Sequence, residues 1–140
     1  MKSNPLKSLD EYSRFIAKVF DHSIVKNSTI TTWSVSKYTG IAEGEVFFVN
    51  GYRLRIREEL DFDAGLITSY GYEVYQGDDK LYWYDDFPHP NDDNLVITFP
   101  HHKHIKPDIK HNRIPASNIR FSRPNLPELI KEINELISQG

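Results

Sequence analysis

The stretch EGEVFFVNGYRLRIREELDF, residues 43–62, decides the fold because it holds two runs of strand-like sequence joined by a tight turn. Residues 52–62 alternate between apolar and charged side chains, which is the period of a β-strand with one buried face. Asn50 and Gly51 separate this run from residues 43–49, and both tolerate the positive φ angles of a type I′ turn. The stretch therefore predicts an antiparallel β-hairpin.

Three further segments around this hairpin have the composition of strands. They are residues 29–38, 66–76 and 80–85, and turn-forming residues separate them from one another and from the hairpin. Connections this short exclude the crossovers that parallel strands need. We therefore expect an antiparallel meander of five strands, with residues 95–99 as a short sixth strand and residues 117–121 as a seventh at the edge.

An amphipathic helix is predicted on each side of the strands. Ser8 and Glu11 form a capping box, and apolar residues at helical spacing follow, which predicts a helix over residues 9–21. Asn125 opens a second helix over residues 125–138, with one apolar face. Both helices need an apolar surface to cover.

Together these patterns predict an α+β fold in a single domain, residues 1–140. We expect an antiparallel, twisted meander sheet of five to six strands within residues 29–99, with the N- and C-terminal helices packed on one face. Six prolines between residues 87 and 124 disfavour regular structure, so residues 100–124 are predicted to be a loop-rich basic segment.

Composition excludes several classes of function. Cysteine is absent, which excludes disulfides, thiolate nucleophiles and Cys-ligated metal centres. Any metal site would use histidines and carboxylates. No apolar stretch approaches the roughly 18 residues of a membrane-spanning helix, and the first five residues lack the apolar core of a signal peptide. We therefore expect a cytoplasmic protein with no membrane partner.

Charge is divided unevenly along the chain. Residues 73–93 carry seven acidic side chains and one lysine, whereas residues 101–123 carry six cationic side chains and one aspartate. An anionic partner such as RNA would dock on the basic segment, or the two segments neutralise each other. Arg53, Arg55 and Arg57 share one side of a predicted strand, where they fit either a phosphate backbone or cross-strand pairing with acids.

Two of the predicted strands carry side chains that are candidates for a function. Glu58 lies on the apolar side of its strand, so it is either a paired rim carboxylate or a catalytic group with a raised pKa. In residues 80–85, Tyr82 and Tyr84 share one side while Trp83 and Asp85 share the other. Exposed aromatic rings of this kind either stack on nucleobases or carry packed helices.

Three of the six histidines lie within the four residues 101–104. If the segment is extended, His102 and His104 project together while His101 and Lys103 point the opposite way. One interpretation is acid–base chemistry, in which one imidazole deprotonates a ribose 2′-hydroxyl, the other protonates the leaving oxygen, and Lys103 stabilises the phosphate.

Two other interpretations of the histidines stay open. As a metal site, His102 and His104 would need His89 or Asp85 as a third ligand, a set that suits zinc, manganese or iron. As structural groups, the imidazoles would bond backbone carbonyls and pair with the acidic segment.

Four motifs in chain order carry a family resemblance. They are Leu54-x-Ile56-x-Glu58, Tyr70-x-Tyr72, Tyr84-Asp85-x-x-Pro88-His89 and Phe99-Pro100-His101-His102-Lys103-His104. Over residues 43–105 this order resembles the toxin TumE-like family of type II toxin–antitoxin systems. Where that family usually has Arg and Asn around the Tyr-Asp step, this chain has Trp83 and Asp86. The resemblance implies a toxin that is neutralised by a partner encoded beside it, often a helix-turn-helix protein.

Similar toxin classes act on RNA, so we expect a metal-independent endoribonuclease that needs no cofactor. Its acid–base pair is His102 and His104, with Lys103 as the charge stabiliser and Asp85 or Glu58 orienting a histidine. His101, His89 and Tyr84 complete the candidate site. The alternatives are a non-catalytic module that binds a protein partner, and a metal-dependent hydrolase that uses the same histidines. The sequence does not determine the oligomeric state.

Overall fold

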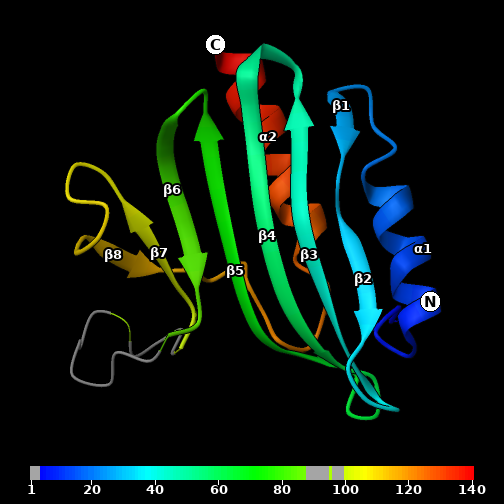
Figure 1. Ribbon diagram of the computed structural model, residues 1–140. Coiled ribbons are helices and arrows are strands. Elements are labelled where there is room, and N and C mark those ends of the chain that lie inside the picture. The colour runs from blue at the N-terminus through cyan, green and yellow to red at the C-terminus, as the bar shows by residue number, and fades with distance from the viewer. Residues whose placement is uncertain (1–3, 88–94, 96–99) are drawn as a thin grey trace.

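The computed structural model describes residues 4–87, 95 and 100–140, and its strands form one antiparallel sheet (Figure 1). Within these residues the sheet has eight strands in the order β1-β3-β4-β5-β6-β7-β8, and β2 also pairs with β3. The elements are α1 (Leu9–Val19), β1 (Val25–Ser28), β2 (Thr31–Ser34), β3 (Thr39–Phe48), β4 (Tyr52–Asp61), β5 (Leu66–Gln76), β6 (Asp79–Asp85), β7 (His102–Ile105), β8 (Arg113–Pro115) and α2 (Leu126–Gln139). The predicted α+β class is confirmed, with more strands than expected.

The predicted hairpin is formed by β3 and β4, which lie inside the sheet between β1 and β5. β3 and β4 pair from Thr39 opposite Asp61 to Phe47 opposite Arg53. In the turn between them Asn50 has φ 63° and ψ 22° and Gly51 has φ 80°. These are the left-handed angles that a type I′ turn requires, so the Asn-Gly pair predicted the turn for the correct reason.

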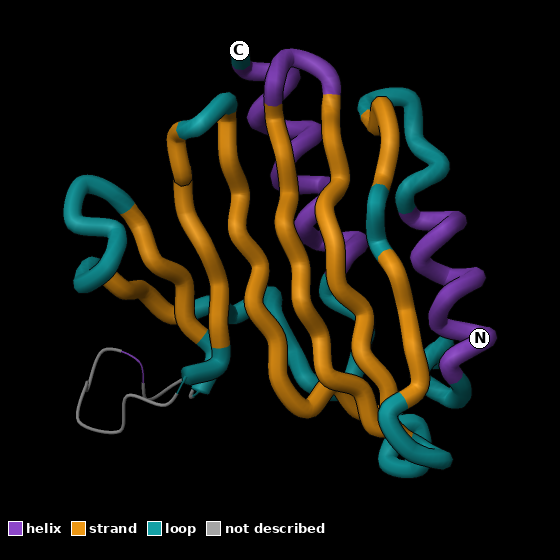
Figure 2. Tube along the Cα trace, viewed as in Figure 1, coloured by secondary structure: helices purple, strands orange, loops and turns teal. Residues whose placement is uncertain are grey.

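Both helices pack on the same face of the sheet: α2 lies behind the strands in Figure 2, and Tyr12 of α1, the helix at the right of the view, bonds Glu58 on that face. α1 begins where the side chain of Ser8 accepts a hydrogen bond from the amide of Glu11, at 3.1 Å, and it ends two residues before the predicted limit. The core between helices and sheet includes alternate side chains of β4, all nearly inaccessible to solvent: Tyr52, Leu54, Ile56, Glu58 and Leu60. We call this side the helix face and the opposite side the outer face.

The strand predicted over residues 29–38 is shorter in the structure, where it covers Thr31–Ser34 (β2), and β1 (Val25–Ser28) is an additional strand before it; both pair with β3. The break between them lies opposite Gly44. A Cβ atom on Gly44 would sit 2.6 Å from the Cα of Ile30, and Gly44 has φ 151°, so the backbones approach too closely for a larger residue. Residues 35–38 lie outside the strands.

The segment of residues 100–124 contains more regular structure than predicted, because β7 and β8 extend the sheet beyond β6. The strand predicted over residues 117–121 is absent. The side chain of Asn118 donates to Glu132 of α2 at 3.1 Å, and the carbonyl of Phe121 accepts from the amide of Ile67 at 2.8 Å. These contacts hold the segment against α2 and the first residues of β5 without forming a further strand. Of the strand predicted over residues 95–99, only Leu95 is described.

Candidate functional site: a histidine–aspartate cluster on the outer face

The pairing of β6 with β7 brings Asp85, His102 and His104 together. Asp85 lies opposite His102 in the ladder, and His104 is two residues further along the same strand, so all three side chains share the outer face. The Nε2 atom of His102 lies 2.7 Å from Oδ1 of Asp85 and 3.1 Å from Nε2 of His104, which is 3.5 Å from Oδ2 of Asp85. We call these three residues the His–Asp cluster.

The other nitrogen of each imidazole in the cluster faces a backbone carbonyl. Nδ1 of His102 lies 3.0 Å from the carbonyl oxygen of Pro100, and Nδ1 of His104 lies 3.0 Å from that of Ile109. Because a carbonyl oxygen can only accept, both Nδ1 atoms carry a proton. In the neutral imidazole this leaves a lone pair on each Nε2, directed at the other ring and at the carboxylate.

The two imidazoles differ in their affinity for a proton. Burial favours a neutral ring in both, but the hydrogen bond to Asp85 outweighs burial at His102 and raises its pKa above the usual value. At His104 burial prevails and lowers the pKa. Burial acts against the charge of Asp85 as well, yet its hydrogen bond with His102 holds the carboxyl pKa below its usual range. The cluster therefore favours a charged Asp85–His102 pair beside a neutral His104.

Among the described residues, the surroundings of the cluster bury the two imidazoles more than the carboxylate. The Trp83 ring stacks on His104 with centroids 4.1 Å apart, and Arg113 of β8 lies opposite His104 in the ladder. His102 is fully buried and His104 nearly so, whereas the side chain of Asp85 is 31% exposed. Solvent and ligands therefore reach the cluster from the carboxylate side.

A shallow basin of about 350 Å³ lies on the outer face beside the cluster. Gly71 of β5 pairs with Asp85 and contributes no side chain, which leaves this space open. Arg57 lies opposite Gly71, and Arg55 lies two residues further along β4. Both arginines line the basin, and Gly71, which also lines it, is the ladder partner of Asp85.

Four of the predicted site residues lie on the helix face, away from the cluster. The ammonium group of Lys103 sits over the rings of Tyr82 and Tyr84, 4.0 and 5.3 Å from their centroids. The hydroxyl of Tyr84 donates to Glu132 of α2 at 2.6 Å. His101 stacks on Tyr70, and its Nδ1 lies 2.6 Å from the Tyr70 hydroxyl.

Glu58, the fourth of these residues, is fully buried under α1. Its oxygens accept hydrogen bonds from the hydroxyls of Tyr12, at 2.6 Å, and Tyr72, at 2.5 Å. Burial raises the pKa of Glu58 to about 6, and the two hydroxyls partly offset that rise. The structure therefore does not bring Glu58 to the histidines. His89 lies outside the described residues.

Arg113 and Gly71 also belong to the surroundings of the cluster, and neither was predicted from the sequence. Arg113 was counted only as one charge of the basic segment, although the ladder sets it beside His104. Gly71 contributes to the site because it has no side chain to fill the space. No sequence pattern near either residue predicts its place beside the cluster, because that place depends on which strands pair and in which register.

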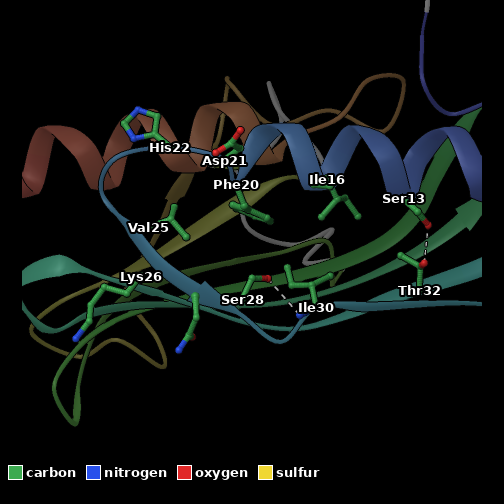
Figure 3. A pocket seen from close by; sticks show the side chains of 12 residues that line it. Ser13, Ile16, Phe20, Asp21, His22, Val25, Lys26, Ser28, Ile30 and Thr32 are labelled. Atoms are coloured by element: carbon green, nitrogen blue, oxygen red, sulfur yellow. Dashed lines mark hydrogen bonds between the residues drawn. The ribbon is translucent and has the colours of Figure 1, made fainter.

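The molecule also has a cleft of about 440 Å³ between α1 and the β1–β2 edge (Figure 3). Ile16, Phe20 and Ile30 line it, and the hydroxyls of Ser13 and Thr32 bond each other at 2.6 Å. Of the predicted site residues that the structure describes, none lines this cleft. The His–Asp cluster is therefore the stronger candidate site.

The fold and the cluster define an α+β protein whose antiparallel sheet has helices on one face and two histidines and an aspartate on the other. The family model "Toxin TumE" matches residues 13–137, so the chain belongs to the toxin TumE family. This makes it a toxin component of a toxin–antitoxin system and implies an antitoxin partner. Comparisons with curated proteins and with solved structures give no match. Among the described residues, neither helix has the length and apolar character needed to span a membrane.

Proposed function

We propose that this toxin acts on RNA by cleaving phosphodiester bonds at the His–Asp cluster. The observation that carries the proposal is the convergence of two buried imidazoles and a partly exposed carboxylate on the face that neither helix covers. Buried titratable groups with pKa values shifted in opposite directions are a feature of catalytic sites. On the helix face, by contrast, the buried carboxylate of Glu58 accepts hydrogen bonds from two tyrosine hydroxyls.

The charges around the cluster suit a phosphate backbone. Arg55 and Arg57 border the basin beside Asp85, and Arg113 lies on the far side of His104. Arg57 also pairs with Glu43 at 3.1 Å and with Glu59 at 3.2 Å, so part of its charge is neutralised. Arg55 is exposed as Arg57 is, and because Arg57 is already paired with two carboxylates, Arg55 is the better candidate to contact a phosphate.

Cleavage of RNA needs three things from the site. A proton leaves the ribose 2′-hydroxyl as its oxygen attacks phosphorus, the bond from phosphorus to the 5′-oxygen breaks, and that leaving oxygen gains a proton. The cluster can support these steps in two ways: by direct proton transfer through His102 and His104, or by holding a metal ion that activates the attacking oxygen. In both, Arg113 would stabilise the extra negative charge on the phosphate.

The second candidate function is a protein-binding module in which the histidines are structural. The bonds from both Nδ1 atoms to backbone carbonyls favour this alternative. The antitoxin implied by the family, which we propose to be a helix-turn-helix protein, would then be the functional partner of the chain. The convergence of the Nε2 atoms favours the catalytic proposal, because purely structural rings have no need to face each other.

The test is to express the wild type and its His102→Ala and His104→Ala variants, and to follow growth and the integrity of total RNA. His111→Ala is the matched control, because His111 is exposed and pairs only locally with Asp108, at 3.1 Å. We expect growth arrest and RNA fragmentation with the wild type and the control, and neither with the two variants. Folded variants that remain equally toxic would overturn the proposal, as would arrest by the wild type with intact RNA.

A further inference from the structure

Three electron-pair donors meet in the His–Asp cluster. Both Nδ1 atoms donate to carbonyls, so the Nε2 atoms of neutral His102 and His104 face each other as acceptors at 3.1 Å. The carboxylate of Asp85 adds oxygens at 2.7 and 3.5 Å from these nitrogens. Acceptors placed this close together repel one another unless a positive charge lies between them. That charge is either a proton or a metal ion.

We infer that Asp85, His102 and His104 bind one divalent transition metal ion of the zinc class. Two imidazoles and one carboxylate form a common set of protein ligands for Zn²⁺, Mn²⁺ and Fe²⁺. One ligand atom from each residue can be chosen so that all three lie within 4.8 Å of one another. The inference uses Asp85 as the third ligand and does not need His89.

The distances are close to those of a shared metal ion. Ligand atoms lie about 2.0–2.2 Å from zinc, which sets two ligands of a tetrahedral site about 3.3–3.6 Å apart. The distance from Nε2 of His104 to Oδ2 of Asp85, 3.5 Å, falls in this range. The two imidazole nitrogens, 3.1 Å apart, and Nε2 of His102 and Oδ1 of Asp85, 2.7 Å apart, are closer, so small side-chain rotations accompany metal binding.

The surroundings of the three residues also fit a metal centre. Metal-binding histidines usually donate their second N–H to a carbonyl or carboxylate, which orients the ring toward the metal. His102 and His104 both do so, toward Pro100 and Ile109. Three protein ligands leave at least one coordination position for water or substrate, and the exposed carboxylate of Asp85 marks the side from which it is reached.

The same geometry disfavours the direct proton transfer that the sequence suggested. A general acid and a general base must each lie about 2.6–3.2 Å from a different oxygen of the substrate. Two nitrogens that already lie 3.1 Å from each other leave no room for a phosphate between them. A metal ion avoids this conflict because both imidazoles then hold one activating centre. The catalytic role of the metal ion rests on the proposed RNA cleavage. The binding of the metal ion does not depend on that proposal.

The experiment measures metal binding by the full chain without RNA. The purified protein is stripped with a chelator and titrated with Zn²⁺, and the bound metal and the thermal unfolding midpoint are recorded, with Mg²⁺ as the comparison because it prefers oxygen ligands. Co²⁺ serves as a spectroscopic probe, since its visible absorption reports the ligand set. We expect one Zn²⁺ per chain, a raised unfolding midpoint, and no such effect of Mg²⁺.

Variants of the cluster test whether Zn²⁺ binds to these residues. Asp85→Asn keeps the side-chain shape, and we expect it and His104→Ala to lower Zn²⁺ affinity at least about 100-fold, beyond the 10–100-fold effect typical of outer-shell changes. His111→Ala should bind as the wild type does. Absence of stoichiometric Zn²⁺ from the wild type, or unchanged binding by folded Asp85→Asn and His104→Ala, would overturn the inference.

The two proposals fail separately. A chain that binds Zn²⁺ at the cluster and leaves RNA intact keeps the metal site and loses the proposed function. If the wild type cleaves RNA in excess chelator and His102→Ala does not, the proposed function holds and the metal site is refuted. The positive charge in the cluster is then a proton.

Discussion

Each face of the sheet holds a carboxylate among polar rings, but the two faces arrange these groups in opposite ways. On the helix face, each oxygen of the buried Glu58 accepts a hydrogen bond from a hydroxyl, that of Tyr12 or that of Tyr72. On the outer face, the Nε2 atoms of His102 and His104 meet beside the partly exposed carboxylate of Asp85, and in the neutral rings both of these atoms are acceptors. Matched donors and acceptors stabilise the fold, whereas converging acceptors are suited to hold a cation.

The same difference separates the predicted site residues. Glu58, Tyr84, His101 and Lys103 lie on the side of the sheet where hydroxyls and aromatic rings surround them. Asp85, His102 and His104 lie on the side that neither helix covers. Substitutions on the outer face should therefore change activity with little effect on stability, and substitutions on the helix face should do the reverse.

The largest expected effect is that of Asp85→Asn on RNA cleavage. The variant keeps the shape of the side chain but loses the negative charge of the carboxylate that bonds His102. RNA cleavage should therefore fall by about 100-fold or more. The free energy of unfolding should change by less than about 1 kcal/mol. Rates on a labelled RNA and denaturant unfolding check both values. Asp79→Asn is the control, because Asp79 forms an exposed pair with Lys106 at 2.6 Å; equal losses in both variants would contradict the proposed site.

On the helix face, Tyr12→Phe should destabilise the protein. It removes the hydroxyl that lies 2.6 Å from Glu58 and leaves one buried oxygen without that donor. The expected decrease in the free energy of unfolding is about 1–3 kcal/mol, with unchanged activity per folded molecule. Tyr38→Phe is the matched control, since Tyr38 is 49% exposed. Full stability with lost activity would show that the Glu58 network takes part in function.

Glu58 should also make stability depend on pH. Burial raises its pKa to about 6 in the folded protein, from the ordinary value of 4.5. A raised folded-state pKa contributes stability that is fully present below 4.5 and is lost as the pH rises through 6. We expect this contribution to reach about 2 kcal/mol. Unfolding of the wild type and Glu58→Gln at pH 4.5, 6 and 7.5 measures it, and parallel profiles for the two proteins would refute the assignment.

Local patterns predicted much of this arrangement. Alternation along each strand separated His102 and His104 from Lys103, and Trp83 and Asp85 from the tyrosines, as the structure confirms. Alternation cannot tell which side of one strand coincides with which side of the next, because that depends on pairing and register. For this reason the sequence grouped Lys103 and Glu58 with the histidines and did not single out Arg113.

The break between β1 and β2 escaped prediction for a related reason. The constraint comes from Gly44, which lies on another strand and admits the backbone of Ile30 at close range. The sequence of residues 29–38 therefore does not predict where the strands break. By contrast, the Asn50-Gly51 turn and the Ser8 cap are determined by residues a few positions apart, and both were predicted correctly.

The smallest expected effect is that of Lys103→Met, which tests the separation of the faces directly. Lys103 neighbours both histidines in sequence, but its ammonium group lies over Tyr82 on the helix face, 4.0 Å from the ring centroid. Methionine keeps the apolar stem and removes the charge, so stability should fall by about 0.5–1 kcal/mol. RNA cleavage and Zn²⁺ binding should stay within about twofold of the wild type, because the sheet lies between Lys103 and the cluster. A tenfold loss of cleavage with intact metal binding would place Lys103 at the phosphate, and the two faces would then act as one site.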